Sequence, residues 1–338
     1  MALNNKNNNL PHLVIDEESN VLSKDEIVYL GDVFNRLGNN DGLIADRVRR
    51  GTKAMVTIMS LMAETDVGVH KISTMLLLYT SLFLSTMLFN SQSWSKIRPK
   101  QMEKLKVIQL RYLKRILGLA NSTCNSFLFL ELGVLPINFE IDKRRLMYLH
   151  RILNLEESDP VYITFQNMAS FVKAGEENWW SEVEVALHKY GLPTDLDEIR
   201  ELKKETFRKM VNEAVEDFAF KELTEECKGL KKTSCLSYES LKLQDYLKKM
   251  YPNQAKILFK CRSKTLDIKT HLTYKYRDSM CRKCGECPEE VQHIINCGRE
   301  QRAPVVDYIT MDVNSDQYDV EVKLMVSSIV RFLEEVEK

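Results

Sequence analysis

The fold class is decided by residues 94–119, which read WSKIRPKQMEKLKVIQLRYLKRILGL. Apolar side chains recur there at three- and four-residue steps, at Leu105, Ile108, Tyr112 and Ile116. That spacing is typical of one face of an amphipathic α-helix. Because proline fits the first turn of a helix, we expect the helix to begin near Pro99.

The composition of the whole chain agrees with this helical pattern. Of 338 residues, 44% are hydrophobic, whereas glycine (12) and proline (8) are scarce. Leu, Lys, Glu and Met favour helices, so we predict a mainly α fold. Near the N-terminus, the apolar pieces 13–15 and 27–30 indicate one short β-hairpin.

The most apolar segment is ISTMLLLYTSLFLSTMLF, residues 72–89, which approaches the length of a membrane span. Six serines and threonines interrupt it, so we favour a buried core helix over a span. The Asn-rich start lacks the pattern of a signal peptide, and eight cysteines without such a signal favour a reducing compartment. We therefore expect an intracellular protein of the nucleus or cytoplasm.

Further helices are expected downstream. Residues 127–155 read as two helices hinged at Gly133 and Pro136, and residues 156–255 as a second helical region. In that region Trp179 and Trp180 fit packing better than base stacking. One long charged helix is expected over residues 195–223, after a break at 191–193, and a terminal amphipathic helix over 320–336.

The strongest local motif is CRKCGECPEEVQHIINC, residues 281–297. Cys281, Cys284, His293 and Cys297 have the spacing C-x2-C-x8-H-x3-C, with two thiols on a turn and the last two ligands on one helix face. Three thiolates and one imidazole make a closed tetrahedral Zn²⁺ site. Zinc is therefore the expected cofactor, and its role is structural because no position stays open for water.

Cys287 leaves an alternative open at this motif, since it could replace Cys284 or be a spare thiol. We favour the spare thiol because C-x2-C is the commoner turn. The segment has few apolar residues of its own, so we expect metal binding to contribute to its folding.

Two stretches are locally basic although the net charge of the chain is zero, with 48 basic and 48 acidic residues. Residues 94–119 carry eight basic residues against one acidic, and residues 256–283 carry nine against two. A charge run can be a plain solvated helix face. In the second stretch Phe259, Tyr274 and Tyr276 add aromatic faces, a combination that suits single-stranded nucleic acid.

Several segments in order resemble the C-terminal part of a non-LTR (LINE-type) retrotransposon reverse transcriptase. They are YLGDVFN (29–35), RVRRGTKA (47–54), MLLLYTSLFLSTMLFNSQSW (75–94), LKVIQLRYLKRILGL (105–119), FLELGVLPI (129–137), RRLMYLHRIL (144–153) and the cysteine-histidine motif. The resemblance covers about residues 20–300 and is weakest between 160 and 250.

The resemblance implies a domain order. Residues 1–40 would be a palm-edge remnant with the hairpin, 41–155 a thumb-like helical domain, 156–255 a helical connector, 256–300 a basic segment with the zinc knuckle, and 301–338 a tail helix. It also implies that thumb and knuckle bind template-primer duplex, element RNA or target DNA. The expected contacts are Arg47, Arg49, Arg50, Lys104, Arg111, Lys114 and Arg115, and, beside the knuckle, Lys264, Lys275, Arg277 and Lys283.

Catalysis by this chain is not expected. The family's polymerase centre is an adjacent aspartate pair, which the sequence lacks, so the aspartates would come from a reverse transcriptase core supplied by another polypeptide. The carboxylates at 307–321 with Lys323 lie in a stretch of only about forty residues after the knuckle, which is too short for a nuclease domain. We predict a non-catalytic protein that binds RNA or DNA and no membrane; the alternative is a helical scaffold with a purely structural zinc site.

Overall fold

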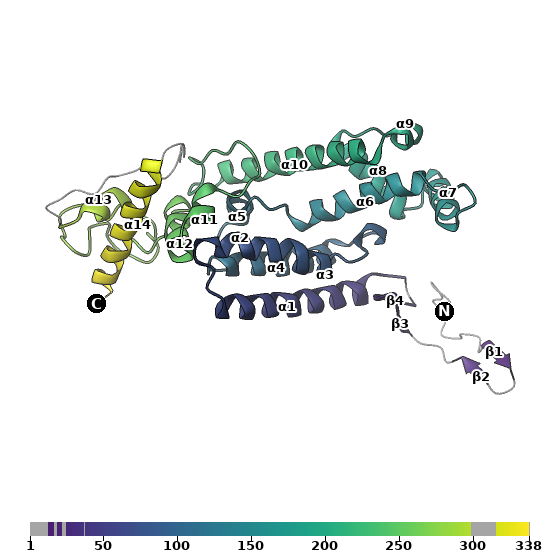
Figure 1. The fold of residues 1–338 in the computed structure, drawn as a ribbon, viewed down its shortest axis with the longest axis horizontal. Coiled ribbons are helices and arrows are strands. Elements are labelled where there is room, and N and C mark those ends of the chain that lie inside the picture. The colour runs from purple at the N-terminus through teal and green to yellow at the C-terminus, as the bar shows by residue number, and fades with distance from the viewer. Residues whose placement is uncertain (1–12, 17–18, 22–24, 37, 299–315, 338) are drawn as a thin grey trace. The chain divides into compact units, whose positions relative to one another are not determined.

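The computed structural model describes residues 13–16, 19–21, 25–36, 38–298 and 316–337 (Figure 1). The Asn-rich start and residues 301–315, with Asp307 and Asp312, lie outside these described residues. Within them the fold is mainly α, as the sequence predicts.

The helices follow one another along the chain, with the longest connections after α10, α12 and α13. They are α1 (Asp41–Glu64), η1 (Gly68–His70), α2 (Lys71–Leu78), the π-helical η2 (Tyr79–Leu84), α3 (Ser85–Met87), η3 (Ser91–Ser93), α4 (Pro99–Ile116), α5 (Asn125–Leu132), α6 (Ile137–Leu153), α7 (Pro160–Lys173), α8 (Trp179–Tyr190), α9 (Leu196–Glu201), α10 (Lys204–Gly229), α11 (Asp245–Lys249), α12 (Pro252–Arg262), α13 (Val291–Asn296) and α14 (Asp316–Val336).

The N-terminal strands form two antiparallel hairpins rather than one. β1 (Leu13–Asp16) pairs with β2 (Ser19–Val21), and β3 (Glu26–Tyr29) pairs with β4 (Asp32–Asn35). Leu30 and Gly31 both have positive φ, as a tight two-residue hairpin turn requires. The expected pairing of residues 13–15 with 27–30 is therefore wrong, because each piece finds a partner across a shorter loop, which costs less closure entropy.

The chain divides into two compact units that interleave along the sequence. Unit 1 comprises Met1–Met59, Leu78–Gln109 and Pro136–Glu216; unit 2 comprises Ser60–Leu77, Leu110–Leu135 and Asp217–Lys338. Four of the boundaries fall inside helices, namely α1, α2, α4 and α10.

Unit 1 is organised around α6, which packs on η3, α7, α8 and α9. Arg145 on α6 is buried and donates to the carbonyl oxygens of Trp94 and Ser95 at 3.0 and 3.1 Å. Both tryptophans at the start of α8 are buried, as expected, and the indole of Trp179 donates to the carbonyl of Gln92 at 2.7 Å. These bonds give partners to backbone carbonyls of the segment that precedes α4.

The long charged helix expected over residues 195–223 is interrupted. α9 ends at Glu201, the next residue Leu202 has an extended backbone, and α10 begins at Lys204. The carbonyl oxygen of Leu202 lies 2.8 Å from Nε2 of buried His150, and the His150 ring stacks on Phe207. Burial of Ile199 and this hydrogen bond together favour the break over a continuous helix.

Unit 2 has its core where α5 meets α12. Phe127 and Phe259 are fully buried with ring centroids 4.7 Å apart. The expected hinge between α5 and α6 is present, since Gly133 ends α5 with φ 62° and Pro136 precedes α6. A Cβ on Gly133 would lie 2.3 Å from the backbone nitrogen of Leu243, so only glycine fits there.

The segment 72–89 is helical, with one face buried. Tyr79 and Phe83 are among its buried residues, while Leu77 is 67% exposed. The expected burial is therefore only partial, because a single helix facing a core covers only one side. Across the described parts of the chain, no helix combines the length and hydrophobicity that a bilayer span requires.

Candidate metal centre

The four residues expected to ligate metal meet in unit 2. Cys281 and Cys284 lie on a turn, His293 is on α13, and Cys297 directly follows that helix. Their ligand atoms all lie within 4.8 Å of one another, so the group could hold a metal ion. The sulfurs of Cys281 and Cys297 are 3.7 Å apart, and the Cys284 sulfur is 3.3 Å from His293 Nε2.

Backbone hydrogen bonds shape the turn that carries the first two thiols. Cys281 N–H donates to the carbonyl of Cys287 at 2.7 Å, and Gly285, with φ 69°, donates to the carbonyl of Cys281 at 2.9 Å. The sulfur of Cys284 accepts from Glu286 N–H at 3.4 Å. Cys287 thus contributes its carbonyl to the turn, and its exposed side chain is outside the four-residue group.

Cys284 and Cys297 have opposite pKa shifts. Backbone N–H groups of Glu286 and Cys287 lower the pKa of Cys284 to about 6. Burial, together with the Cys281 and Cys284 sulfurs, raises the pKa of Cys297 to about 12. The turn therefore favours a thiolate at Cys284, which is the form that binds metal.

Glu289 stabilises the turn through hydrogen bonds. This fully buried carboxylate accepts from the backbone and side chain of Arg282 at 2.8 and 3.0 Å, and from Lys269 N–H at 3.2 Å. The Arg282 guanidinium also donates to the carbonyl of Asp267 at 2.7 Å. Sequence reasoning missed Glu289, because no pattern distinguishes it from its neighbour Glu290.

An apolar layer supports the cluster. Val291, Ile294 and Ile295 are buried on α13, which packs against α14, as Figure 1 shows. α14 contributes buried Val322, Met325, Val326, Ile329 and Phe332. The few apolar residues of the segment itself therefore form a core together with the terminal helix.

The first three expected nucleic-acid contacts lie in unit 1, and each forms an ion pair with an aspartate of this chain. Arg47 is 1% exposed; it pairs with Asp32 and donates to the carbonyl of Gly31 at 2.9 Å. Burial removes Arg47 as a phosphate contact and makes it a support for the β3–β4 hairpin. Arg49 and Arg50 both pair with Asp46 and remain partly exposed.

The four expected contacts on α4 differ in exposure. Lys104, Arg111 and Arg115 are exposed, and their spacing of seven and eleven residues puts them on one face of the helix. Lys114 is only 7% exposed and donates to the carbonyl of Asn121. Lys114 is therefore not available as a phosphate contact, because its ammonium group caps a backbone carbonyl.

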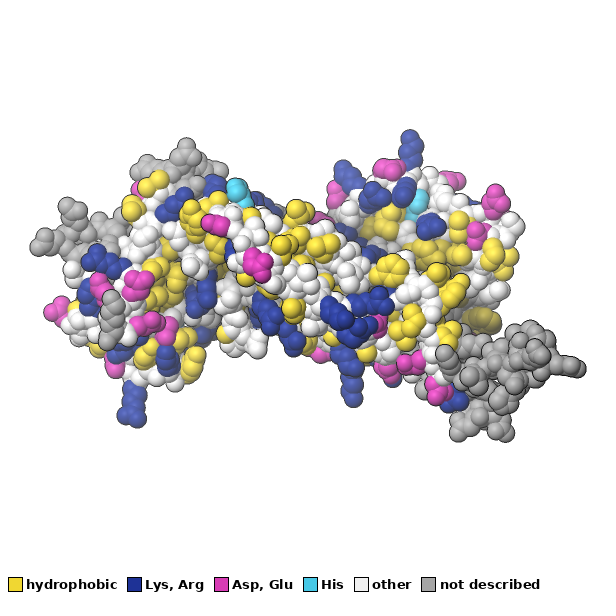
Figure 2. Space-filling model, turned by 60° about the horizontal axis from the view of Figure 1, so that its bottom comes forward, with side chains coloured by type: hydrophobic (Ala, Val, Ile, Leu, Met, Phe, Trp, Pro, Cys, Tyr) yellow, Lys and Arg dark blue, Asp and Glu magenta, His cyan; other side chains and the backbone are white. Residues whose placement is uncertain are grey.

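Some of the basic side chains in and beside the segment before the knuckle form ion pairs. Lys275 bonds Asp267 at 2.7 Å and Lys283 bonds Glu335 at 2.6 Å, whereas Arg277 is exposed and Lys264 is half-buried. Of the three aromatic faces expected there, Phe259 is buried and Tyr276 is half-buried. Tyr274 is 83% exposed. On the face drawn in Figure 2, basic side chains are interspersed with acidic and apolar ones.

A second buried carboxylate, Glu131, was also missed. The two oxygens of fully buried Glu131 accept from the hydroxyls of Tyr238 and Tyr246, each at 2.6 Å, and from Arg262 at 2.9 Å. Burial and the Glu131 charge raise the pKa of both tyrosines. The sequence hint was an acidic residue inside the apolar run FLFLEL, where an unpaired charge would be costly.

Comparison with known proteins gives no match, whether with models of protein families, with curated proteins or with solved structures.

Proposed function

We propose that this chain is a non-catalytic, nucleic-acid-binding part of a protein related to non-LTR retrotransposon reverse transcriptases. The observation that carries the proposal is that the four ligands meet directly after a segment that exposes Arg277 and Tyr274. Arginine attracts phosphates and tyrosine can stack on bases. The order of sequence segments that resemble the family supports the assignment to it.

Zinc is the proposed ion. For tetrahedral Zn²⁺ with Zn–S bonds of about 2.3 Å and Zn–N bonds of about 2.0 Å, sulfurs lie about 3.8 Å apart and sulfur lies about 3.5 Å from nitrogen. The observed separations of 3.7 and 3.3 Å fit these values. Three thiolates and an imidazole also favour zinc over magnesium or calcium, which prefer oxygen ligands.

On this proposal, nucleic acid is held by backbone contacts rather than by base reading. Lys104, Arg111 and Arg115 present a row of positive charge on α4, and Lys264, Lys275 and Arg277 add charge before the knuckle. Lysine and arginine contacts of this kind fix register on phosphates without reading sequence. Polymerisation would depend on a catalytic core supplied by another polypeptide.

The test is fluorescence anisotropy with the purified full chain and short labelled single-stranded RNA and DNA, titrated with salt. We expect binding that weakens linearly in log–log form, with a slope of about −0.7 per phosphate contact. The triple variant Lys264→Glu, Lys275→Glu, Arg277→Glu should bind weakly. Its control is Lys173→Glu, Lys209→Glu, which changes exposed lysines on α7 and α10. Absence of binding by the unmodified chain in low salt would refute the proposal.

The alternative, a scaffold with a purely structural zinc site, is favoured by the ion pairs around the knuckle. Lys269–Asp278 and Arg282–Glu289 hold charges that would otherwise be free for phosphates. A scaffold would tolerate the triple charge reversal. Absence of strand binding by the unmodified chain, together with an unchanged zinc content and melting temperature in that variant, would therefore decide for the scaffold.

A further inference from the structure

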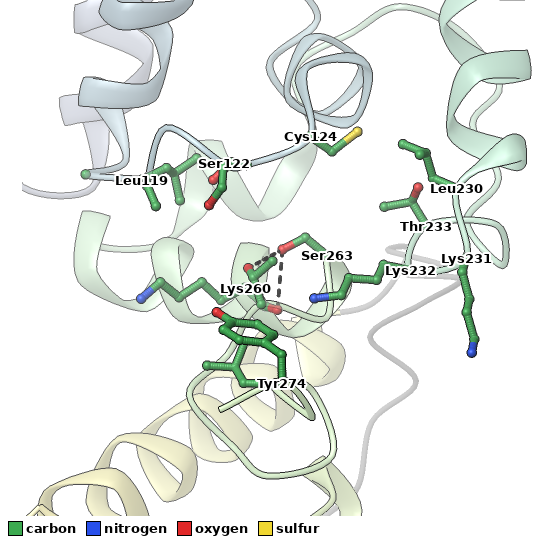
Figure 3. Close-up of a pocket in the computed structure, with 15 residues that line it drawn as sticks. Leu119, Ser122, Cys124, Leu230, Lys231, Lys232, Thr233, Lys260, Ser263 and Tyr274 are labelled. Carbon is green, nitrogen blue, oxygen red and sulfur yellow. Dashed lines mark hydrogen bonds between the residues drawn. The ribbon is translucent and has the colours of Figure 1, made fainter. Parts of the chain in front are cut away.

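Unit 2 contains a hollow of about 820 Å³ that lies outside the metal cluster (Figure 3). Four chain segments line it: the α4–α5 connection at 118–124, the turn after α10 at 230–233, the end of α12 at 260–265, and residues 272–274. The volume is that of a site for a small organic ligand or for one unit of a polymer.

The charge around the hollow is positive. Lys231, Lys232 and Lys260 line it, and none of the described lining residues is acidic. In Figure 3 the side chain of Lys232 reaches toward Ser263 and Tyr274, while Lys231 points away. The nearest acidic influences on Lys260 come from Asp267 and Glu337, which are not part of the lining.

Lys260 in the lining and His271 close to it both have lowered pKa values. Burial, then the nearby ammonium of Lys256, lowers the pKa of Lys260. Burial, then Lys232 and Lys264, lowers the pKa of His271 to about 4. Where positive groups lower one another's pKa, an anion bound between them stabilises their protonated forms.

The hollow also offers hydroxyls and an aromatic face. Ser122, Thr123 and Thr265 are among its lining residues. Tyr274 lines it as well and is 83% exposed, so most of its ring is not covered by protein. A tyrosine left uncovered beside lysines provides the two groups that single-stranded nucleic acid needs, a stacking surface and a phosphate counter-charge.

We propose that this hollow binds one nucleotide unit of a single strand, with the phosphate at Lys232 and the base stacked on Tyr274. The inference rests on the proposed function and extends it, because it adds a site outside the zinc ligands and outside the α4 face. Residues Lys232 and Tyr274 come from two separate lining segments, so the site exists only in the folded unit.

The variants Lys232→Glu and Tyr274→Ala test the site, because both side chains are exposed and their change leaves the core intact. By anisotropy with a labelled single strand, Tyr274→Ala should weaken binding by about 5-fold or more. Tyr274→Phe keeps the ring and should bind nearly as the unmodified chain does. Lys232→Glu should make the salt slope shallower by about 0.7, whereas Lys209→Glu should not change it.

A second readout locates the base. An oligonucleotide containing 5-iodouridine should photo-crosslink to Tyr274, identified by mass spectrometry of the digested protein. Crosslinks confined to other residues would overturn the assignment even if the variants bind weakly.

The outcomes separate this inference from the proposed function. If the unmodified chain binds strands and Lys232→Glu and Tyr274→Ala bind equally well, the hollow is not the site while nucleic-acid binding stands. If the unmodified chain binds no strand, both fail. If AMP displaces the probe at the same nucleotide concentration as an unlabelled strand does, the occupant is a free nucleotide, and the strand assignment is overturned.

Discussion

Glu131 on α5 and Arg262 at the end of α12 form a buried ion pair, with Oε1 2.9 Å from the guanidinium, although 131 positions separate them in sequence. Their side chains are 0% and 2% exposed. Two tyrosine hydroxyls occupy further acceptor positions on the carboxylate, so the pair is satisfied on several sides. Such a pair is costly to break because the remaining charge stays buried.

Replacing Glu131 with glutamine should lower the free energy of unfolding by about 3–5 kcal/mol, because Arg262 would keep its charge without a counter-ion. Urea unfolding followed by circular dichroism measures the change. The matched control is Glu239→Gln in the same unit, a change at a side chain that is 92% exposed. Equal unfolding midpoints for the two variants would contradict the role assigned to Glu131.

Gly133→Ala should destabilise the protein far more than Gly191→Ala. Both glycines end helices with nearly the same φ, 62° and 63°, so the backbone penalty of about 1–2 kcal/mol is shared. Only at Gly133 would the new Cβ meet backbone, 2.3 Å from Leu243 N, whereas nothing lies within 4 Å of the other. Thermal melts of the two variants compare these costs directly, and similar losses would show that the close approach at Gly133 is unimportant.

Replacing the proposed metal ligand Cys284 with serine should abolish stoichiometric zinc, while Cys287→Ser should retain it. Elemental analysis of the purified proteins measures the zinc content. Cobalt substitution should give the intense visible bands of a tetrahedral thiolate site in the unmodified chain and in Cys287→Ser, but not in Cys284→Ser. Loss of metal from Cys287→Ser would instead show that the ligand set differs from the four clustered residues.

Cys124 should react with iodoacetamide at neutral pH. Hydrogen bonds from the Cys227 thiol, the Ser126 hydroxyl and nearby backbone N–H groups lower its pKa to about 6. The thiolate therefore predominates above that pH and is lost below it, so the alkylation rate should fall as the pH drops through about 6. Mass spectrometry after timed labelling measures this rate. A half-maximum near the ordinary thiol range would contradict the prediction, and Cys227→Ala should move the half-maximum upward.

The sequence predicted most of the local structure because its signals were local. Helical periodicity placed α4, and the pair Gly133 and Pro136 placed the hinge. The ligand spacing identified the four residues that cluster. Each of these depends on residues close together in the chain, where periodicity and turn chemistry are informative.

The errors concern partners that lie outside the helix carrying the residue. Nothing local indicated that Arg47 would be buried on Asp32, or that Lys114 would bond a backbone carbonyl. Nor did the knuckle sequence indicate that α14 would complete its apolar layer. Charge counts overestimate the exposed basic surface for this reason, since a positive residue in a run can be turned inward to a partner that only the fold supplies.

The Glu131 cluster bears on how the chain folds. Its hydrogen bonds join residues 107, 115 and 131 positions apart, and loops of that length close slowly. We expect the cluster to form late, so that before then the carboxylate of Glu131 is hydrated on the apolar run FLFLEL. A charge in such a run acts as a gatekeeper against aggregation. The residue that later fixes the core would thus protect the chain while the core is still open.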